Sequence, residues 1–350
     1  MEFAFTAEQQ MIGETARTWF AEQATSARTR AAMAGDGMDA ALWSGFCREL
    51  GLSGVALPEH HGGAGLGLVE LAIVAEAAGA QVAALPLLGH AAVARAIAAG
   101  GSEAQQAHWL PRLIGADTLA AAALDANVAP DGASLTGSAA MVPHGGNAGL
   151  FLVSKGNQAW LVPADTGVKA HTPVTMDQTR PLATITLDAV AAEPLADCAA
   201  ALAAARATGW VVLAAEGLGV AQAALDRTVA YAKDRVQFGR AIGSFQAYKH
   251  RLADMMIANE QARSAVYWAA CAIDEGSDDA SLALHAAKSF AADTAFKCAA
   301  DMIQLHGGIG FTWEHDAHLF FKRARSLQTL MGSGAWHREQ VARIVLGDMA

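Results

Sequence analysis

The chain has 350 residues, of which 53% are hydrophobic and only 17% are charged, so it can bury a large core divided over two or three domains. Its net charge is −10 and its basic residues are scattered, which argues against nucleic acid or an anionic membrane as the main partner. The four cysteines are widely spaced without a C-x-x-C pair, as is typical of reduced thiols in a cytoplasm.

No export signal or membrane span is evident. The N-terminus leads directly into Phe3-Ala-Phe-Thr-Ala-Glu-Gln-Gln10, without a basic region followed by an apolar run and a cleavage site. The longest uncharged stretch, Ala77 to Ala94, contains Pro86 and His90, which suits two core helices joined by a turn better than a bilayer span. We therefore expect a cytoplasmic protein.

The composition and the hydrophobic periodicity of the sequence change twice along the chain. Residues 1–111 are rich in alanine and are interrupted by glycine clusters at 51–54 and 62–67, which predicts an N-terminal helical domain. Residues 112–195 contain alternating and short apolar runs between turn residues, which predicts a middle β domain. Residues 196–350 return to helical periodicity.

The last third predicts a bundle of long antiparallel helices. One helix carries an apolar seam with strict 4,3 spacing, formed by Val211, Ala215, Leu218, Gln222, Leu225, Val229 and Ala232. A later helix is expected to begin near Ser277 to Asp279 and to stop at Gly307-Gly308.

The segment Arg235-Val-Gln-Phe-Gly-Arg-Ala-Ile-Gly-Ser-Phe-Gln246 follows the seam helix. We expect Arg235 in the last turn of that helix and Gly239 as its terminator, so that the guanidinium projects beyond the helix end and suits a pyrophosphate. Ser244 is expected to cap the next helix, with Gln246 in its first turn. The alternative is that Arg235 pairs with an acidic neighbour and that Gln246 is an ordinary surface residue.

The segment Gln304-Leu-His-Gly-Gly-Ile-Gly-Phe311 ends the later helix. Its glycines allow a phosphate-bearing ligand to approach the backbone closely. Because it follows a helix rather than joining a strand to a helix, it does not match the Rossmann fingerprint, and nicotinamide binding is not expected.

Together these segments resemble the flavin-binding signatures of the acyl-CoA dehydrogenase family. The same order and spacing extend over nearly the whole chain, through Thr6-x-Glu8-Gln, Pro58-Glu-His-His-Gly-Gly-Ala-Gly-Leu66 and Tyr231-Ala-Lys-Asp-Arg-Val-Gln-Phe-Gly239. The resemblance implies a mainly α fold with an N-terminal helical domain, a small β barrel and a C-terminal four-helix bundle.

It also implies FAD, bound between subunits. By this resemblance Arg235, Phe238 and Gln246 hold the adenosine diphosphate of one FAD, while Gln304, Gly307 and Gly308 reach a FAD across a dimer interface. Family members remove the α proton of an acyl-CoA with a glutamate while a hydride leaves the β carbon for flavin N5. Electron-transfer flavoprotein is the acceptor that the family implies.

The positions that carry the base in the family hold other residues here. Most members have it in a Tyr-Glu-Gly-Thr-like segment, which corresponds to Leu330-Met331-Gly332-Ser333, so Met331 stands at the base position. Other relatives place the glutamate early in the seam helix beside a substrate-binding arginine, and the corresponding residues are Gly209 and Trp210. Neither methionine nor glycine accepts a proton.

Other chemistry-bearing residues give weaker signals. Glu216 and Glu339 are candidate replacement bases, although each lies about two helical turns from a base position. The histidines show no H-x-x-x-H or H-E-x-x-H pattern, so no metal site is expected, and the chain contains no G-x-S-x-G elbow. Trp313-Glu-His-Asp316 is interpreted as a loop joining two helices. Leu119 to Ala126 and Met141-Val-Pro-His144 replace the usual flavin-side residues of the β domain.

Three hypotheses follow. The first makes the chain the non-catalytic partner in an α2β2 flavoenzyme that oxidises a bulky acyl-CoA such as a steroid-derived one, because the chain resembles subunits of heteromeric enzymes that degrade steroid side chains. The second is a self-sufficient homomeric dehydrogenase with an atypical base. The third is an acyl-CoA-binding or scaffold protein of the same fold without a redox role.

Overall fold

The computed structural model describes residues 4–347, which form two compact units. The helical unit comprises residues 4–26, 71–83 and 210–347, and the mixed unit comprises residues 27–70 and 84–209. Helices α4 (Leu68–Ala80) and α7 (Cys198–Asp234) contribute to both, because the division falls inside them. The three-part division at residues 111 and 195 stays a prediction, since these units are built from interleaved segments.

The helices of the mixed unit are short. They are α2 (Ser26–Ala34), α3 (Ala40–Arg48), α5 (Leu87–Gly100) and α6 (Glu103–Ile114), with 3-10 turns η1 (Leu52–Gly54) and η2 (Glu59–His61). The glycine clusters at 51–54 and 62–67 interrupt the helices as predicted. Helix α6 begins at a capping box, in which Ser102 and Gln105 each bond the other's backbone N–H.

Eight strands lie between residues 120 and 194. They are β1 (Ala120–Ala123), β2 (Asn127–Asp131), β3 (Ser134–Pro143), β4 (Leu150–Lys155), β5 (Gln158–Pro163), β6 (Lys169–His171), β7 (Leu182–Ala191) and β8 (Glu193–Pro194), with η3 (Ala164–Thr166) after β5. One sheet has the order β1-β4-β5-β8 and the other β2-β3-β7-β6. Strand β1 runs parallel to β4, and the other neighbours are antiparallel.

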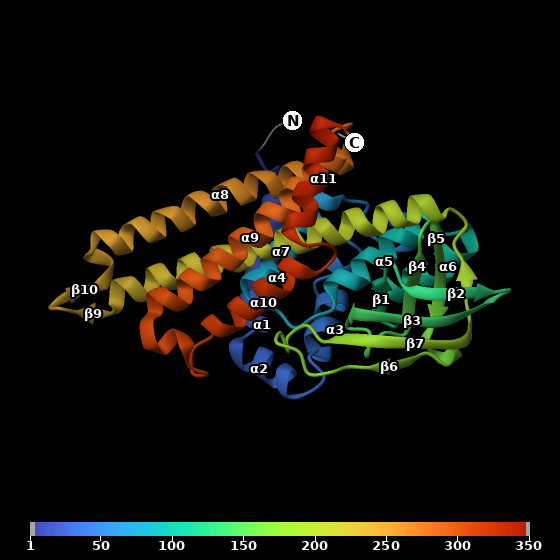
Figure 1. Cartoon of the computed structure of the whole chain (residues 1–350), viewed down its shortest axis with the longest axis horizontal. Coiled ribbons are helices and arrows are strands. Elements are labelled where there is room, and N and C mark those ends of the chain that lie inside the picture. The colour runs from blue at the N-terminus through green and yellow to red at the C-terminus, as the bar shows by residue number, and fades with distance from the viewer. Residues whose placement is uncertain (1–3, 348–350) are drawn as a thin grey trace. The chain divides into compact units, whose positions relative to one another are not determined.

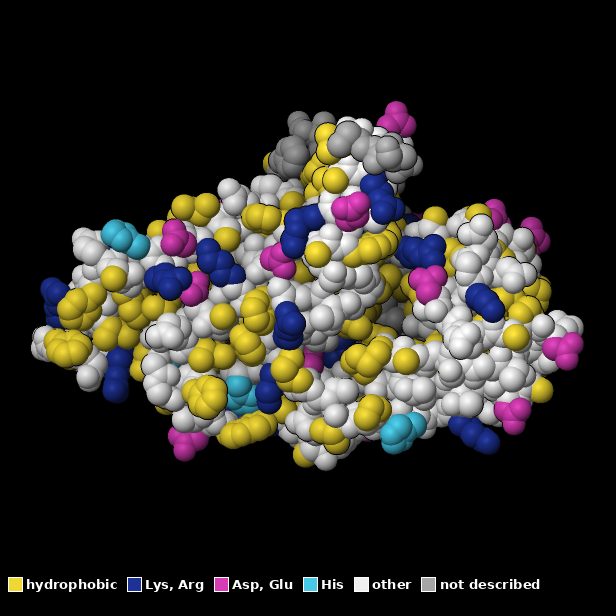
Figure 2. Space-filling view, viewed as in Figure 1, with side chains coloured by type: hydrophobic (Ala, Val, Ile, Leu, Met, Phe, Trp, Pro, Cys, Tyr) yellow, Lys and Arg dark blue, Asp and Glu magenta, His cyan; other side chains and the backbone are white. Residues whose placement is uncertain are grey.

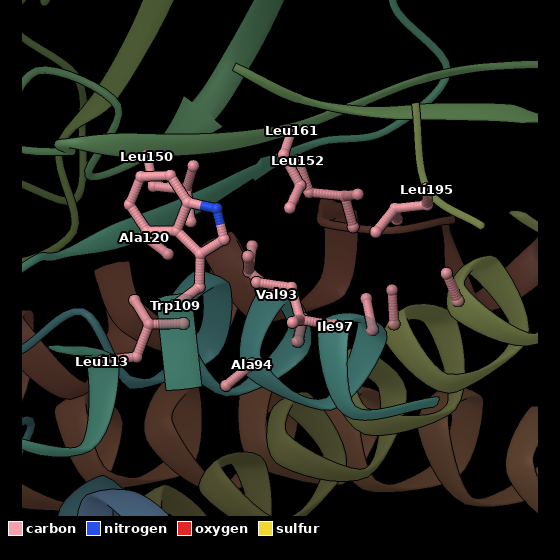
Figure 3. Packing of buried hydrophobic residues seen from close by; sticks show 14 of the residues in the cluster. Val93, Ala94, Ile97, Trp109, Leu113, Ala120, Leu150, Leu152, Leu161 and Leu195 are labelled. Carbon is pink, nitrogen blue, oxygen red and sulfur yellow. The ribbon is translucent and has the colours of Figure 1, made fainter. Parts of the chain in front are cut away.

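The first sheet is covered on both faces, which explains the unbroken apolar run of β4. Leu150 and Leu152 point to the face that α5 and α6 cover, where Val93, Ile97 and Trp109 pack against the sheet (Figure 3). Phe151 and Val153 point to the opposite face and pack with Leu135, Ile185 and Leu187 of the second sheet. Strand β7 alternates buried and exposed residues, as predicted for Thr184 to Leu187.

The helical unit is built on the long helices α7 (Cys198–Asp234), α8 (Gln246–Asp274) and α9 (Ala280–His306), with several shorter elements. In chain order it has α1 (Ala7–Gln23), most of α4 and α7, β9 (Val236–Gln237), β10 (Arg240–Ala241), η4 (Ile242–Ser244), α8 (Gln246–Asp274), α9 (Ala280–His306), η5 (Gly307–Phe311), α10 (Ala317–Thr329) and α11 (Gly334–Leu346). Helices α8 and α9 run side by side, and α10 and α11 pack on α9 (Figure 1).

Glycines let the helices of this unit cross closely. A Cβ on Gly219 of α7 would lie 2.0 Å from the Glu76 carbonyl oxygen, and one on Gly79 of α4 would lie 2.2 Å from the Glu216 carbonyl oxygen. Both distances are shorter than any van der Waals contact, so α4 and α7 meet backbone to backbone. The Glu76 carboxylate then accepts hydrogen bonds from Arg263 and Tyr267 of α8, each at 2.6 Å.

Most of the predicted seam of α7 is buried. Val211, Ala215, Leu218, Leu225 and Ala232 are buried, whereas Gln222 and Val229 are partly exposed. By length and composition α7 could cross a membrane, but 61% of its most apolar window is buried inside the protein, as in a core helix. The mainly α fold with a middle β region is therefore confirmed, and the site segments lie where the long helices of the helical unit end.

Candidate functional site

The segment after α7 forms a β-hairpin with a two-residue turn. Gln237 of β9 pairs with Arg240 of β10, and Phe238 and Gly239 between them have φ of 53° and 77°. Positive φ at both central residues defines a type I′ turn. The prediction that Gly239 terminates the helix is therefore wrong: α7 ends at Asp234, and Arg235 is the first residue beyond it.

The hairpin displays an aromatic ring at its tip. Phe238 is 90% exposed and holds a left-handed backbone conformation that a phenylalanine rarely adopts. Behind it the Arg240 guanidinium lies 4.1 Å from the ring centre of Phe245. Such strain persists where the surroundings over-determine the backbone, and it is common at ligand-binding positions.

Helix α8 begins as predicted at Gln246, but its cap differs from the prediction. Ser244 belongs to η4 and its hydroxyl donates to the Ala241 carbonyl at 2.7 Å, so it does not cap the helix. The N-cap position is occupied by Phe245, whose side chain cannot accept a hydrogen bond. Helix α9 likewise has Asp279 at its N-cap without a side-chain cap bond.

The end of α9 is fixed by two tyrosines. The Tyr248 hydroxyl donates to the Leu305 carbonyl at 3.0 Å, and the Tyr231 hydroxyl donates to the His306 carbonyl at 3.3 Å. The Tyr231 and His306 rings stack with centres 4.4 Å apart. Because Tyr231 belongs to α7 and Tyr248 to α8, the predicted segments come together at one end of the helical unit (Figure 1).

Helix α9 stops at Gly307 as predicted, with φ of 65°. Nothing lies within 4 Å of the place where a Cβ would stand on Gly307 or on Gly308. Gln304 in the last turn is exposed. The turn therefore offers open backbone and one amide side chain to a ligand.

These residues fit the phosphate end of a flavin nucleotide. Among residues 4–347 the side chains of Arg235, Gln246 and Gln304 have no hydrogen-bond or ion-pair partner, so the expected alternative of an acidic neighbour to Arg235 is not seen. Guanidinium and amide groups are the donors that bind phosphate and ribose oxygens. Exposed Val236, Phe238 and Phe311 add apolar surface, and Figure 2 shows hydrophobic side chains gathered at the end that carries β9 and β10, beside Lys and Arg.

Trp210 and Met331, which the sequence analysis places at or beside the expected base positions, contact each other. The indole N–H of Trp210 donates to the Met331 carbonyl oxygen at 2.9 Å. His337 Nε2 contacts the same oxygen at 3.1 Å, and Met331 has a left-handed φ of 53°. Gly209, in the mixed unit, is a buried residue inside α7. Met331, the residue expected at the base position, therefore takes part in a hydrogen-bonded contact through its backbone carbonyl.

A buried lysine holds the rest of this loop. The Lys288 ammonium donates to the carbonyls of Gly332 and Gln328, the latter at 3.3 Å, and the residue is fully excluded from solvent. Burial lowers the pKa of Lys288 to about 8, although nearby Asp293 opposes the shift. His337 is also fully buried, and burial, Lys288 and His285 together lower its pKa to about 3.

The candidate replacement bases are committed elsewhere. Glu216 forms an ion pair with Arg323 of α10 inside the core, where both side chains are buried. Glu339 of α11 is exposed and lies 3.3 Å from Arg343, one turn along the same helix. Trp313 to Asp316 joins η5 to α10, as predicted, and Asp316 lies 3.6 Å from Arg227.

Two further expectations concern metal binding and the cysteines. No group of three or more His, Cys, Asp or Glu side chains that could hold a metal ion occurs between residues 4 and 347. Burial raises the pKa of the Cys47 and Cys298 thiols to about 12, so both stay protonated at neutral pH. Cys47 and Cys298 thus behave as small buried apolar groups, while Cys198 and Cys271 are partly exposed.

A helical N-terminal region, two packed sheets and a bundle of long helices define the architecture of flavin-dependent acyl-CoA dehydrogenases. The family model for the Acyl-CoA dehydrogenase, N-terminal domain, matches residues 6–117, and that for the Acyl-CoA dehydrogenase, C-terminal domain, matches residues 210–346. The chain belongs to the acyl-CoA dehydrogenase family.

Individual relatives agree with this assignment. The chain is 39% identical to acyl-CoA dehydrogenase IpdE2 of Mycobacterium tuberculosis, and the match covers 93% of both proteins. Among solved structures, the Tcur3481-Tcur3483 steroid ACAD superposes with a TM-score of 0.89 at 32% identity, covering 97% of this chain and 98% of the other. The ChsE4-ChsE5 complex from Mycobacterium tuberculosis gives 0.90 at 27% identity and covers both chains completely.

Sequence reasoning missed several residues that shape this region. Tyr231 and Tyr248 gave no signal beyond their place on helices, because their acceptors are backbone carbonyls. Lys288 was detectable in principle, since it is a lone cation in the apolar run Ala286-Ala287-Lys288-Ser289-Phe290. Nothing in the sequence showed that its partners would be two carbonyls of the loop around Met331.

Proposed function

We propose that this chain is the subunit of a heteromeric, FAD-dependent acyl-CoA dehydrogenase that helps to bind the flavin but supplies no catalytic base. The partner subunit then carries the glutamate, and the assembly oxidises a bulky acyl-CoA, with an α2β2 stoichiometry. The observation that carries the proposal is that Met331, the residue expected at the base position, has no carboxylate and binds Trp210 through its carbonyl. At the expected flavin end, the backbone at Gly307 and Gly308 is open.

The relatives support the heteromeric form and the substrate class. One is a steroid ACAD named for two components, and another is a complex of two components. A steroid-type acyl-CoA suits a chain similar to both. Electron-transfer flavoprotein is our proposed acceptor, and the cytoplasm is the proposed location.

Arg235, Phe238 and Gln246 would hold the adenosine diphosphate of one FAD, and Gln304, Gly307 and Gly308 would contact a FAD across the subunit interface. Their exposure is as expected for a site completed by a second chain. When bound, FAD supplies the oxidant that accepts a hydride from the acyl β carbon. The chain's own residues bind and orient the nucleotide, whereas proton removal needs a positioned carboxylate that the partner would provide.

The test is to purify the chain alone and together with the product of a neighbouring acyl-CoA dehydrogenase gene, and to measure flavin content, mass and acyl-CoA oxidation. We expect flavin and activity only in the co-purified complex. Flavin and activity in the chain alone would instead support a self-sufficient homomeric enzyme. Absence of FAD with every partner would favour a scaffold without a redox role.

A matched pair of arginine variants sharpens this test. Arg235→Ala removes a free guanidinium, and a lost charge-assisted hydrogen bond weakens binding by about 10- to 100-fold, so we expect the complex to lose FAD on dilution. Arg343→Ala removes an equally charged but remote exposed arginine of α11 and should leave flavin content unchanged. Equal flavin retention in the two variants would remove Arg235 from the proposed site.

A further inference from the structure

We propose that Trp210 is a plug, which keeps the acyl group of a CoA thioester out of this chain's own base region. The inference deepens the proposed function and rests on it for the position of that region. It concerns why the chain should lack an acyl site of its own, and not only why it lacks a base.

The plug is held by a hydrogen bond and by neighbouring rings. Trp210 Nε1 donates to the Met331 carbonyl at 2.9 Å, and the indole ring centre lies 4.8 Å from that of His285 and 5.3 Å from that of His337. Trp336 of α11 completes the group at 6.2 Å. The partly buried indole thus contacts α9, α11 and the loop at Met331 from its own helix α7, and lies between them.

The two histidines make this cluster a neutral one. The Met331 oxygen can only accept, so His337 Nε2 must carry a proton. Because its pKa lies far below neutrality, His337 is uncharged and its Nδ1 accepts the 2.8 Å hydrogen bond from His285 Nδ1–H. Both rings therefore present no charge to the indole, and the cluster holds together as a packed aromatic core.

The loop opposite the indole is fixed as well. Its carbonyls at Gln328, Met331 and Gly332 all accept hydrogen bonds, from Lys288, Trp210 and His337. A Cβ on Gly332 would lie 2.7 Å from the Trp336 ring, so the rings also press on the loop backbone. The loop has little freedom to move aside.

An acyl chain entering this region would have to displace the indole. The displaced indole N–H would lose its partner inside the protein, which costs about 1 to 3 kcal/mol for an unsatisfied group, and the Met331 carbonyl would keep only its contact with His337 Nε2. The aromatic contacts of Trp210 with His285 and His337 would be lost in addition. A substituent as small as alanine at residue 210 would leave the space open without that cost.

The experiment measures binding of S-octyl-CoA, a thioether that cannot be oxidised as a thioester substrate, to the full chain by isothermal titration calorimetry. We expect no saturable binding to the wild type. Trp210→Ala should bind saturably, with a Kd at least about tenfold below the weakest Kd that the titration of the wild type can detect. Trp210→Phe keeps an aromatic ring at this position, smaller than the indole and without its N–H, and should stay largely closed. Trp19→Ala, which removes a half-buried tryptophan of α1 outside the cluster, is the matched control.

Circular dichroism and thermal unfolding establish that each variant is folded, and hydrogen exchange of the amides at 330–333 reports on the loop independently of ligand. The plug is overturned if the wild type binds S-octyl-CoA as tightly as Trp210→Ala, if Trp210→Phe opens the site equally, or if Trp210→Ala gains no binding. None of these readouts requires flavin, a partner or turnover. Failure of the plug is therefore distinct from failure of the heteromeric assignment.

Discussion

Glu216 of α7 and Arg323 of α10 form an ion pair in which the side chains are only 7% and 2% exposed. The same guanidinium donates to the Ala83 carbonyl at 3.3 to 3.4 Å, so one arginine ties α7 and α10 to the chain just beyond α4. A buried carboxylate held by this guanidinium is poorly placed to take a proton from a ligand. The pair is a structural feature of the helical unit.

Glu216→Ala removes the carboxylate that pairs with the buried Arg323 guanidinium. Removing one member of a buried pair typically costs about 3 to 5 kcal/mol, so we expect the free energy of unfolding to fall by that amount in urea titrations. Glu339→Ala is the control, because its exposed i,i+4 pair with Arg343 contributes only about 0.3 to 0.5 kcal/mol. A Glu216→Ala protein with wild-type stability but no turnover in the complex would instead identify Glu216 as a base.

The glycines of α7 provide a second contrast in stability. Gly219→Ala places a Cβ 2.0 Å from the Glu76 carbonyl and forces α4 and α7 apart, so we expect a loss of several kcal/mol or an unfolded chain. Gly217→Ala places a Cβ 3.3 Å from the Ala291 carbonyl of α9, a tight contact that a small shift relieves. Since alanine favours a helix by about 1 kcal/mol over glycine, this variant should fold with nearly unchanged stability. Similar melting temperatures for both would contradict the close crossing.

Much of this fold could be predicted because its periodicities are local and consistent. Most of the 4,3 seam from Val211 to Ala232 is buried, the run Leu150 to Val153 is a strand covered on two faces, and Gly307 ends α9. Thr6 and Gln9 form the capping box that begins α1. Each of these features depends on residues within a few positions of one another.

The errors and omissions have a different physical origin. The sequence gives little sign of the hairpin, because a type I′ turn requires a positive φ at the residue before Gly239 and phenylalanine disfavours it. From the sequence, Gly239 is therefore interpreted as a helix terminator. Trp210 and Met331 are 121 residues apart, and their bond joins a side chain to a backbone carbonyl. The carbonyls that bind Lys288 carry no side-chain signature either. Tertiary contacts of this kind leave no periodic trace.

Lys288 should make the stability of the chain depend on pH above neutrality. Its ammonium has a pKa of about 8 when folded and about 10.5 when unfolded. Between these values the unfolded chain binds a proton that the folded chain lacks, so this group makes the free energy of unfolding rise with pH from 8 to 10.5, by about 3 kcal/mol in full. Below pH 8 its contribution is constant and at its lowest.

Lys288→Met removes this titration. The variant loses the bonds to the loop carbonyls at every pH, which shifts its whole stability curve, but the rise attributable to residue 288 should disappear. Urea unfolding of both proteins between pH 7.5 and about 9.5 measures the difference in slope. Parallel curves would show that Lys288 titrates normally.

Phe238 links backbone strain to ligand binding at the tip of the hairpin. A left-handed conformation costs a non-glycine residue roughly 1 to 2 kcal/mol, whereas Asn-Gly is the favoured sequence for a type I′ turn. Phe238→Asn should therefore raise the free energy of unfolding by about 0.5 to 1 kcal/mol, because the residue is 90% exposed and gives up little packing.

The same substitution removes the aromatic surface that the proposed flavin site presents. We expect the complex of Phe238→Asn with its partner to be more stable toward urea when flavin-free, yet to retain FAD several-fold less well, because stacking on an aromatic ring is lost. Val345→Asn, at an exposed apolar residue of α11, controls for a general change in surface polarity. A variant that is stabilised and keeps its FAD would mean that the strained ring serves subunit contact rather than the nucleotide.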